Sequence, residues 1–346
     1  MTLRTMGKSN NIETRYLRQE EFARWDELVA LSEDGTIFQT STWLLAFAKW
    51  QHLKFRIAGC FKGDQLTGGM AFTCKKKFGW IRVMQIPYKT SFYGPVLAKT
   101  ETKYISKRES HHQAIIDALV SFLLSENKLF SAILPPSYED VRPFQWRGFQ
   151  AGIHYTYLAR LSSETDLLSM YDPPLRRQIK KGEQEEHALL MENSPERILQ
   201  AYTLEQLSFQ RQKLDLNYAL SDDFVSFILS LAEKGSAQTY VMEYQGKAIA
   251  AQVVILDQAK KRAYYWLAGA DEEYLSTGLN QLLLHKILID LAEKGFETFD
   301  FVGAGTESIA RYKASFNFPL VPFYSVTKEL GAARLGMLIK NLIRKS

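Results

Sequence analysis

The clearest pattern of apolar and polar positions lies between residues 278 and 327. Leucine and isoleucine recur every three or four positions over 278–294, which predicts a helix that Gly295 ends with a left-handed cap. An apolar strand at 298–302 follows, then a glycine-rich loop, a short cationic segment and a last strand at 321–326. Open α/β sheets bind ligands at the carboxyl ends of their strands, so this order predicts a ligand-binding edge.

The same order of elements occurs earlier in the chain, where alternating apolar runs flank a turn glycine and predict a hairpin. The predicted strands of the first copy are 55–61, 66–73, 80–86, 92–97 and 130–134, and those of the second are 154–159, 238–244, 248–257, 262–270 and 298–302. Capped or amphipathic segments predict helices at 20–31, 42–51, 110–125, 173–186, 195–212 and 221–234. We interpret the repeat as two copies of one α/β unit, although chance repetition of a common order would give the same pattern.

The length of 346 residues favours two domains. We predict an N-terminal lobe at 12–150, a C-terminal lobe with the main cleft at 151–328 and a basic amphipathic helix at 329–346. Each lobe is expected to hold a mixed, largely antiparallel twisted sheet flanked by helices. The chain carries 43 basic and 38 acidic residues, and a net charge of +5 permits a polyanionic partner without requiring one.

Several classes of protein are disfavoured by composition and motifs. No apolar run approaches the roughly 18 to 20 residues that span a bilayer, and two cysteines without a signal peptide are typical of a reducing cytoplasm. The six histidines show no metal-ligand spacing. No dinucleotide, Walker or Gly-x-Ser-x-Gly pattern occurs, so metal, nicotinamide and ATP chemistry are not expected.

Four segments carry a resemblance to a known family. Thr298-Phe-Asp-Phe-Val-Gly303 resembles a strand with an embedded acid, and Arg311-Tyr-Lys-Ala-Ser-Phe316 resembles an aromatic-Lys-x-x-Phe-Gly element. Upstream, Phe38-Gln-Thr-Ser-Thr-Trp43 resembles the entry to an early helix, and Leu175-Arg-Arg-Gln-Ile-Lys-Lys181 a basic helix that opens the second domain. Together they are similar to the Fem-type acyltransferases, a branch of the GNAT acyltransferase superfamily.

This resemblance implies two tandem GNAT-like lobes and an enzyme that forms an amide on an amine of a cell-envelope precursor, a peptide or a sugar. It also implies acyl-CoA, an acyl carrier or aminoacyl-tRNA as donor, with no metal. Asn317 stands where the family usually has glycine, and asparagine is the next best residue for a positive φ. We see no insertion long enough for the family's helical tRNA-binding arm, which disfavours tRNA.

Two residues are the predicted catalytic pair. Asp300, at a strand end, is placed to accept a proton or hold an amine, and Lys313 to stabilise an oxyanion or a phosphate. The alternative for Asp300 is a structural carboxylate that caps the Gly303 loop or pairs with Lys313. The alternative for Lys313 is an ordinary solvated lysine.

Other polar and aromatic residues are candidates for holding the substrate. Gln39 and Trp43 are predicted to line a substrate groove, with Tyr93 and Tyr265 as pocket aromatics and Arg311 beside the sheet edge. A tryptophan on an apolar helix face and tyrosines on strands are equally consistent with a structural core.

The predicted donor site combines a helix start with a basic helix. The helix beginning near Gly278 offers a positive pole to phosphate, with Asn280 in its first turn. The GNAT signature Arg/Gln-x-x-Gly-x-Gly/Ala is missing there, because residues 276–280 retain one glycine. A second helix presents Arg176, Arg177, Lys180 and Lys181, which suit the phosphates of CoA, a carrier or tRNA or form an ordinary solvated face.

The tail places apolar residues on one side of a helix and cations on the other, as in helices that lie on anionic membranes. The alternative is that this face packs on the protein itself or on a second subunit. We therefore expect a cytoplasmic enzyme, with peripheral contact at the inner membrane surface as an option. Two other functions stay open: a CoA-dependent N-acyltransferase acting on a small amine or glycan, and a non-catalytic binding protein that keeps the double fold. Oligomeric state is not predicted.

Overall fold

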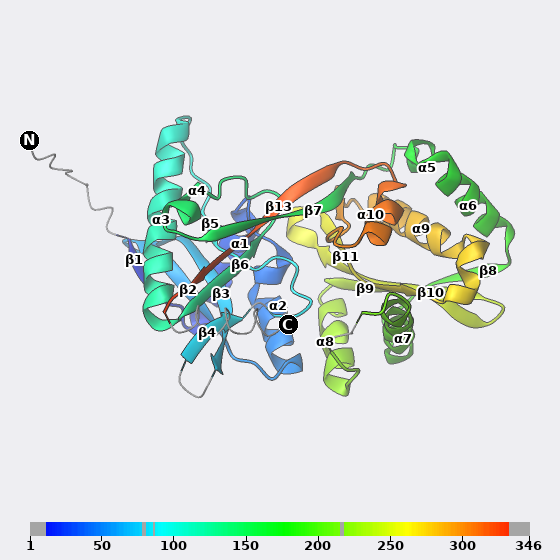
Figure 1. Ribbon diagram of the computed structural model, residues 1–346, viewed down its shortest axis with the longest axis horizontal. Helices are drawn as coiled ribbons and strands as arrows, with labels where there is room; N and C mark the ends of the chain where they lie inside the picture. Colours follow the sequence, from blue (N-terminus) through cyan, green and yellow to red (C-terminus); the bar gives the residue numbers. More distant parts are fainter. Residues whose placement is uncertain (1–11, 78–80, 86, 215–217, 332–346) are drawn as a thin grey trace, which may run out of the picture. The chain divides into compact units, whose positions relative to one another are not determined.

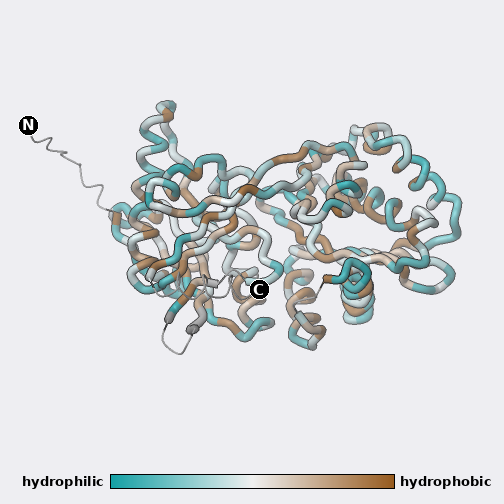
Figure 2. The backbone as a smooth tube through the Cα atoms, in the orientation of Figure 1, coloured by the Kyte–Doolittle hydropathy of each residue, from teal (hydrophilic) through white to brown (hydrophobic). Residues whose placement is uncertain are grey.

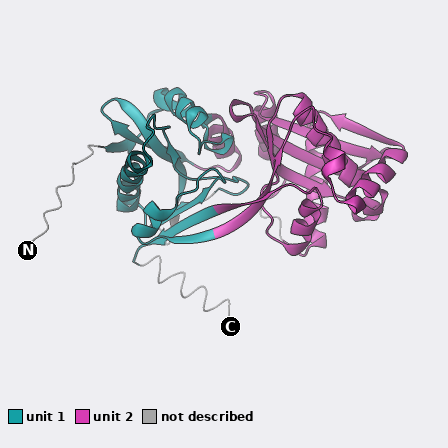
Figure 3. Cartoon of the chain, turned by 90° about the horizontal axis from the view of Figure 1, so that it is seen from above, with its two compact units in different colours: residues 1–41, 54–152, 324–346 teal, residues 42–53, 153–323 magenta. Residues whose placement is uncertain are grey.

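The chain forms two compact units that exchange short segments (Figure 3). The structure is a computed structural model that describes residues 12–77, 81–85, 87–214 and 218–331. Unit 1 comprises residues 1–41, 54–152 and 324–346, and unit 2 comprises residues 42–53 and 153–323. Two segments lie in a different unit from the predicted one. Residues 42–53 belong to unit 2, and the end of the last strand, from residue 324, belongs to unit 1. The predicted tail helix lies mostly outside the described residues.

Unit 1 is built on a sheet in the order β1-β2-β3-β4, with β5 also pairing with β3. All its registers are antiparallel. A second pairing joins β6 to the end of β13. The strands are β1 (Glu13–Tyr16), β2 (Phe55–Lys62), β3 (Gln65–Lys77), β4 (Ile81–Gln85), β5 (Val96–Leu97) and β6 (Leu129–Leu134), with β13 (Leu320–Glu329) entering from unit 2.

The core of unit 1 lies between this sheet and the long helix α3 (Ile105–Glu126). Ile115, Ile116 and Leu119 of α3 are fully buried against apolar residues of β2, β3 and β6. The other helical segments are η1 (Gln19–Glu21), α1 (Phe22–Leu31), η2 (Ile37–Gln39) and α4 (Arg142–Trp146).

Unit 2 holds the strand order β7-β12-β11-β10-β9-β8. β11 and β12 run parallel, whereas the other registers that the structure describes in this unit are antiparallel. The strands are β7 (Gln150–Arg160), β8 (His187–Met191), β9 (Ala237–Tyr244), β10 (Lys247–Asp257), β11 (Arg262–Ala270) and β12 (Thr298–Asp300).

Helices cover both faces of the unit 2 sheet (Figure 1). On one face lie α9 (Leu279–Glu293) and, outside it, α6 (Pro173–Gln184), which is strongly hydrophilic along its length (Figure 2). On the other lie α7 (Pro195–Arg211) and α8 (Asp222–Ala232), joined by α2 (Ser41–Trp50) through its tryptophans. The remaining segments are α5 (Leu167–Met170), η3 (Gln258–Lys260), η4 (Glu272–Thr277) and α10 (Glu307–Ala314).

Most predicted elements are present, and the differences have local causes. β1 and β8 were not predicted, because four or five residues with little alternation give no strand signal. Only Val96 and Leu97 of the predicted strand 92–97 pair as a strand. Helix α3 starts at Ile105, five residues before its predicted start, because the polar first turns mask the periodicity.

The layers of unit 2 approach closely where α7 crosses β11. A Cβ atom on Gly269 would lie 2.1 Å from the carbonyl carbon of Leu204 and 2.2 Å from the amide nitrogen of Glu205. Both are backbone atoms of α7, which cannot move aside as a flexible side chain would. Glycine at this position therefore sets the distance between the helix and the sheet.

We predict that Gly269→Ala lowers the free energy of unfolding by about 3 kcal/mol, because overpacking against backbone forces α7 away from the sheet. Gly305→Ala is the matched control, since a Cβ there meets nothing within 4 Å. Urea unfolding followed by circular dichroism measures both. Equal stability of the two variants would contradict the close approach.

Candidate functional site

The two parallel strands of unit 2 separate after three paired residues. Arg262, Ala263 and Tyr264 of β11 pair with Thr298, Phe299 and Asp300 of β12. β11 then continues to Ala270, whereas the chain after β12 stays with β7, where the amide of Phe301 donates to the carbonyl of Tyr157 (3.0 Å). We call this divergence the strand split. It leaves the β12 side of β11 without a register partner beyond Tyr264.

Asp300 ends β12 at the strand split and is completely buried. Its Oδ1 accepts hydrogen bonds from the hydroxyl of Thr156 (2.7 Å) and the amide of Val302 (2.8 Å). Thr156 in turn accepts from the amide of Gly303 (3.1 Å). Burial raises the pKa of Asp300, and these hydrogen bonds and the charges of Arg262 and Lys313 oppose that rise.

One oxygen of this carboxylate remains free. Oδ2 of Asp300 is buried and has no hydrogen-bond partner among the described residues. A buried unpartnered oxygen costs free energy, so it is either a reservoir of strain or an acceptor for a ligand. The two predicted roles of Asp300 therefore use different atoms. Oδ1 serves the structural role, which is to cap the Gly303 loop, and Oδ2 is left for the chemical role.

Lys313 reaches the same loop from α10 and is 5% exposed. Its ammonium group donates to the carbonyls of Phe301 and Gly303 (2.7 Å), and more weakly to that of Val302 (3.4 Å). We call this arrangement the β12 clamp. It holds a backbone in which Val302 and Gly303 have φ values of 50° and 83°. Lys313 is not the solvated lysine of the alternative interpretation.

The electrostatics of the β12 clamp are unusual for a lysine. Burial lowers the pKa of Lys313 to about 8, and the negative charge of Asp300 opposes that shift. The ammonium also lies 5.0 Å from the centre of the Tyr265 ring, a cation–π contact. Lys313 is therefore a cation at neutral pH that loses its proton within reach of mildly alkaline conditions.

Aromatic side chains complete the surroundings of the β12 clamp. The Tyr265 ring is half-buried and lies parallel to Phe301, with centroids 6.3 Å apart. Asn280 of α9 donates to the hydroxyl of Tyr312 (3.5 Å), which neighbours Lys313 in sequence. The structure thus brings together three of the predicted site residues, Asp300, Lys313 and Tyr265, while Asn280 contacts the neighbouring Tyr312.

Two polar residues of this region were missed. Thr156 links Asp300 to Gly303, and Gln252 of β10 is 2% exposed with its Nε2 unpartnered among the described residues. Gln252 pairs in register with Ala268, in the part of β11 beyond the strand split. A polar residue inside the apolar run 248–257 was the signal for Gln252, whereas nothing in the sequence marks Thr156.

Helix α6 packs against the predicted phosphate pole at Gly278. A Cβ atom on Gly278, whose φ is 84°, would lie 2.0 Å from the carbonyl oxygen of Gln178, and one on Gly182 would lie 2.9 Å from the carbonyl of Gly278. Lys181 adds a hydrogen bond to the carbonyl of Ser276 (2.7 Å). Gly278 thus serves helix packing, because the α6 backbone occupies the space beside it.

The basic residues of α6 differ in their exposure. Leu175, Ile179 and Gly182 form its buried side, so Arg177 and Lys180 extend into solvent while Arg176 is half-buried. Of the predicted donor-binding cations, Arg177 and Lys180 are exposed. Lys181 is exposed as well, but its ammonium group is bonded to the carbonyl of Ser276.

Three predicted substrate residues are interior. Gln39 accepts from the backbone and hydroxyl of Thr36 and donates to the Gly94 carbonyl (3.0 Å). Trp43 is fully buried against Phe227 and Trp266, and Tyr93 is 1% exposed. Each is satisfied by packing or hydrogen bonds within its own unit, which favours the structural interpretation of these residues. Arg311 is exposed and pairs with Glu307 on α10.

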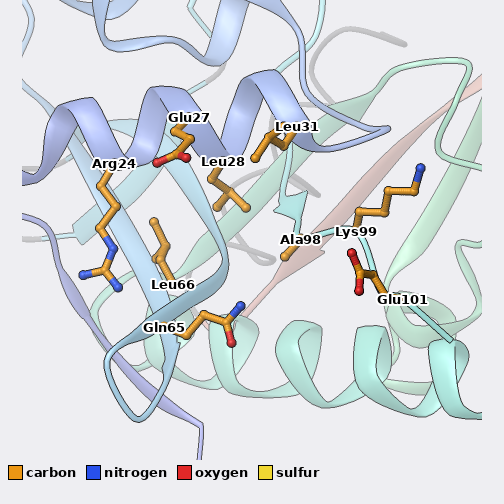
Figure 4. A pocket seen from close by; sticks show the side chains of 9 residues that line it. All are labelled: Arg24, Glu27, Leu28, Leu31, Gln65, Leu66, Ala98, Lys99 and Glu101. Carbon is orange, nitrogen blue, oxygen red and sulfur yellow. The ribbon is translucent and has the colours of Figure 1, made fainter.

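Unit 1 contains a separate pocket of about 410 Å³ between α1, the start of β3 and the segment after β5 (Figure 4). Leu28, Leu31 and Leu66 form its apolar part, with charged side chains around them. None of the predicted site residues lines it. No group of three or more His, Cys, Asp or Glu side chains in the described ranges is placed to hold a metal ion.

Comparisons with known proteins place the strand split within a region that matches a known family. Residues 174–314 match the family model of the acetyltransferase (GNAT) domain. The chain carries a GNAT acetyltransferase domain. This match covers the strand split, the β12 clamp and α9, and it supports an N-acyltransferase.

Solved structures extend the likeness of fold to most of the chain. FemX superposes with a TM-score of 0.67 at 12% identity, over 90% of this chain and 96% of that one. The C-terminal domain of a putative lysylphosphatidylglycerol synthetase from Agrobacterium fabrum gives 0.58 at 13%, over 94% and 96%. A tandem GNAT protein from the clavulanic acid biosynthesis pathway gives 0.51 at 12%, over 92% and 99%. No curated protein matches the sequence.

These findings confirm the predicted resemblance to the Fem-type branch and the predicted fold of two tandem GNAT-like lobes. Asn317, which replaces the family's glycine, has a φ of 57°, so the expected positive φ is present. Among the described residues no helix is long and apolar enough to cross a membrane.

The lowered pKa of Lys313 predicts a change of stability with pH. Its folded pKa of about 8 lies below the unfolded value of 10.5, so between these values the unfolded chain binds more protons and stability rises with pH. From pH 7 to pH 10 we expect the wild type to gain about 2.5 kcal/mol relative to Lys313→Met. Urea unfolding at both pH values measures this difference.

Lys234→Met is the control, because Lys234 is exposed. Its free energy of unfolding should change with pH as the wild type does. If Lys313→Met also follows the wild type, the ammonium is not held in a low-dielectric site and the account of the β12 clamp fails.

Proposed function

We propose that this N-acyltransferase transfers an acyl or aminoacyl group to an amine of a cell-envelope precursor, a peptide or a sugar, at the strand split of unit 2. One observation carries the proposal. A buried acid with a free oxygen and a buried lysine with a lowered pKa meet where β11 and β12 diverge. Perturbed acids and bases concentrate at functional sites, and their position at a strand end is where α/β folds bind ligands.

The strand split supplies donors for the acyl group. β11 has no register partner in β12 beyond Tyr264, so its backbone N–H groups on that side are available to a carbonyl oxygen. Backbone donors aimed at a developing oxyanion contribute about 3 to 4 kcal/mol each to transition-state stabilisation in acyl transfer. This fold therefore needs few catalytic side chains.

Lys313 is proposed to add positive charge at the oxyanion. Its bond to Val302, at 3.4 Å, is the weakest of the three, and the ammonium would exchange it for the substrate oxygen as negative charge develops. The bonds to Phe301 and Gly303 would keep the side chain in place meanwhile. Burial leaves the cation weakly solvated, which strengthens its field in the site.

Asp300 is proposed to handle the proton. When the amine attacks the acyl carbon, a C–N bond forms, the bond to the donor breaks and the amine must lose a proton. Oδ2 of Asp300 is the free acceptor, while Oδ1 is held by Thr156 and Val302. The proton would then pass to the leaving group of the donor, which restores the carboxylate.

The position of α6 limits where the acyl donor can bind. Because the α6 backbone lies against Gly278, a pyrophosphate bound at the start of α9 in the usual GNAT manner has little room. We propose an acyl or aminoacyl donor whose phosphates lie along α6, at Arg177 and Lys180, which includes an acyl carrier or a charged tRNA. A fold neighbour named as a lysylphosphatidylglycerol synthetase supports aminoacyl chemistry on this scaffold.

A cell-envelope acceptor is proposed on two grounds. The Fem-type resemblance implies one, and the name of the lysylphosphatidylglycerol synthetase is that of a protein that aminoacylates a lipid. Work on such a precursor at the cytoplasmic face of the membrane would explain a basic amphipathic tail, whose sequence lies mostly beyond residue 331.

We expect Asp300→Asn and Lys313→Met each to lower kcat for amide formation by roughly 100-fold, the effect of losing a proton acceptor or an oxyanion partner. The assay follows a labelled acyl group from acyl-CoA, acyl carrier or aminoacyl-tRNA to an amine. Lys234→Met is the control, since Lys234 is exposed and belongs to no candidate site. Full activity in both site variants would place the chemistry elsewhere.

Neutralising Arg177 and Lys180 together should raise the KM of the donor and flatten its dependence on salt, because fewer counterions are released when phosphate binds. The KM of the acceptor should not change. Replacing Glu183 and Gln184 at the end of the same helix by alanine controls for general effects on α6. Identical donor kinetics across a salt series would exclude α6 from the donor site.

A further inference from the structure

Unit 1 carries an exposed apolar tip where helix α3 begins. Tyr104 is 52% exposed and Ile105 is 63% exposed, although both are large and hydrophobic. The first turns of α3 extend past the other elements of unit 1 (Figure 1), and hydropathy along the backbone alternates sharply there (Figure 2). Neighbouring elements therefore do not cover these two side chains.

The tip is surrounded by cations. Lys99, Lys103, Lys107 and Arg108 are all exposed, and residues 99–108 contain a single acid, Glu101, which leaves three positive charges in excess. Two acids outside this segment lie close. Glu33 approaches Lys99 at 3.9 Å with both side chains mostly exposed, and Glu109 is bonded to Arg142 at 2.7 Å. We call residues 99–108 the basic tip.

Two of these cations lie over the exposed ring. The ammonium groups of Lys103 and Lys107 are 5.3 Å and 5.0 Å from the centroid of Tyr104. Two positive charges on the Tyr104 ring therefore neighbour the exposed side chain of Ile105 at the start of α3. No group of the proposed acyl-transfer site lies on this segment, so the proposed function does not account for it.

We propose that the basic tip is a docking surface for anionic phospholipid bilayers. Lysine and arginine would contact the headgroup phosphates, as they do in polybasic segments that bind anionic leaflets. Ile105 would enter the boundary between headgroups and acyl chains, and Tyr104 would lie at headgroup level, where tyrosine is enriched. The amphipathic tail of the chain is a different segment.

A bilayer fits these features better than RNA does. Single-stranded RNA is held by bases stacked on open aromatic faces, and the Tyr104 ring is already engaged by two ammonium groups. An isoleucine with most of its surface in water finds no partner on a phosphate backbone, whereas it gains free energy in an acyl environment.

Vesicle co-sedimentation with the full-length chain tests this inference. Vesicles of phosphatidylcholine alone are compared with vesicles that also contain phosphatidylglycerol. The triple variant Lys103→Gln, Lys107→Gln and Arg108→Gln should lose about 100-fold in partitioning to the anionic vesicles, as expected for three lost cations. Ile105→Ser should lose roughly threefold to tenfold, because it removes the aliphatic contact.

The control neutralises three exposed cations elsewhere on unit 1. Arg18→Gln, Lys54→Gln and Lys128→Gln remove the same charge, and Lys128 lies beyond the far end of the 22-residue α3, about 33 Å from its start. This variant should keep most of the binding. Thermal unfolding of each variant shows that the fold is intact, because all substituted side chains are exposed.

The outcomes decide between a lipid surface and its alternatives. A triple variant that partitions like the wild type would overturn the proposal, and so would equal losses in the triple variant and the control, which reflect net charge alone. A loss of affinity for tRNA or single-stranded RNA without a loss on vesicles would also overturn it and assign the basic tip to nucleic acid.

Discussion

The burial of Lys313 is the constraint on which the site of unit 2 depends. An ammonium group in the protein interior is tolerated only if hydrogen bonds and opposite charge replace its hydration. Here the carbonyls after β12 supply the hydrogen bonds, Tyr265 supplies a ring face, and Asp300 supplies the charge. Satisfying the lysine therefore determines the path of the chain as it leaves the sheet.

That path has chemical consequences. Because the segment after β12 follows β7 and is held by Lys313, it cannot continue beside β11, and the strands separate. The carboxylate of Asp300 is enclosed by the same arrangement, with Oδ1 bound and Oδ2 free. The structural roles and the proposed chemical roles therefore fall on one pair of residues, which is why the sequence could not separate them.

Close backbone contacts position the other layers of unit 2. Gly269 lets α7 approach β11, and Gly278 and Gly182 let α6 approach the start of α9. The second contact changes the role of Gly278 at the start of α9. A glycine at the start of this helix ordinarily frees backbone N–H groups for phosphate, whereas here it admits another helix. The cations on the outside of α6 are the surface proposed for the donor.

Local patterns in the sequence determined the order of elements, the two similar units and the cluster around Asp300 and Lys313. Those features depend on residues adjacent in the chain, such as the helix before Gly295 and the segment from Thr298 to Lys313. Two of the four segments behind the Fem-type resemblance lie here, and they bring Asp300 and Lys313 to the same loop.

Only the tertiary structure decided which of the candidate residues lie close together. Gln39, Trp43 and Tyr93 are of residue types that can line a substrate groove, but packing within each unit buries them. Thr156 joins Asp300 from 144 positions away, and no periodicity signals such a contact. Burial, pKa and hydrogen-bond satisfaction depend on what surrounds a side chain in space, and a single sequence records only its neighbours along the chain.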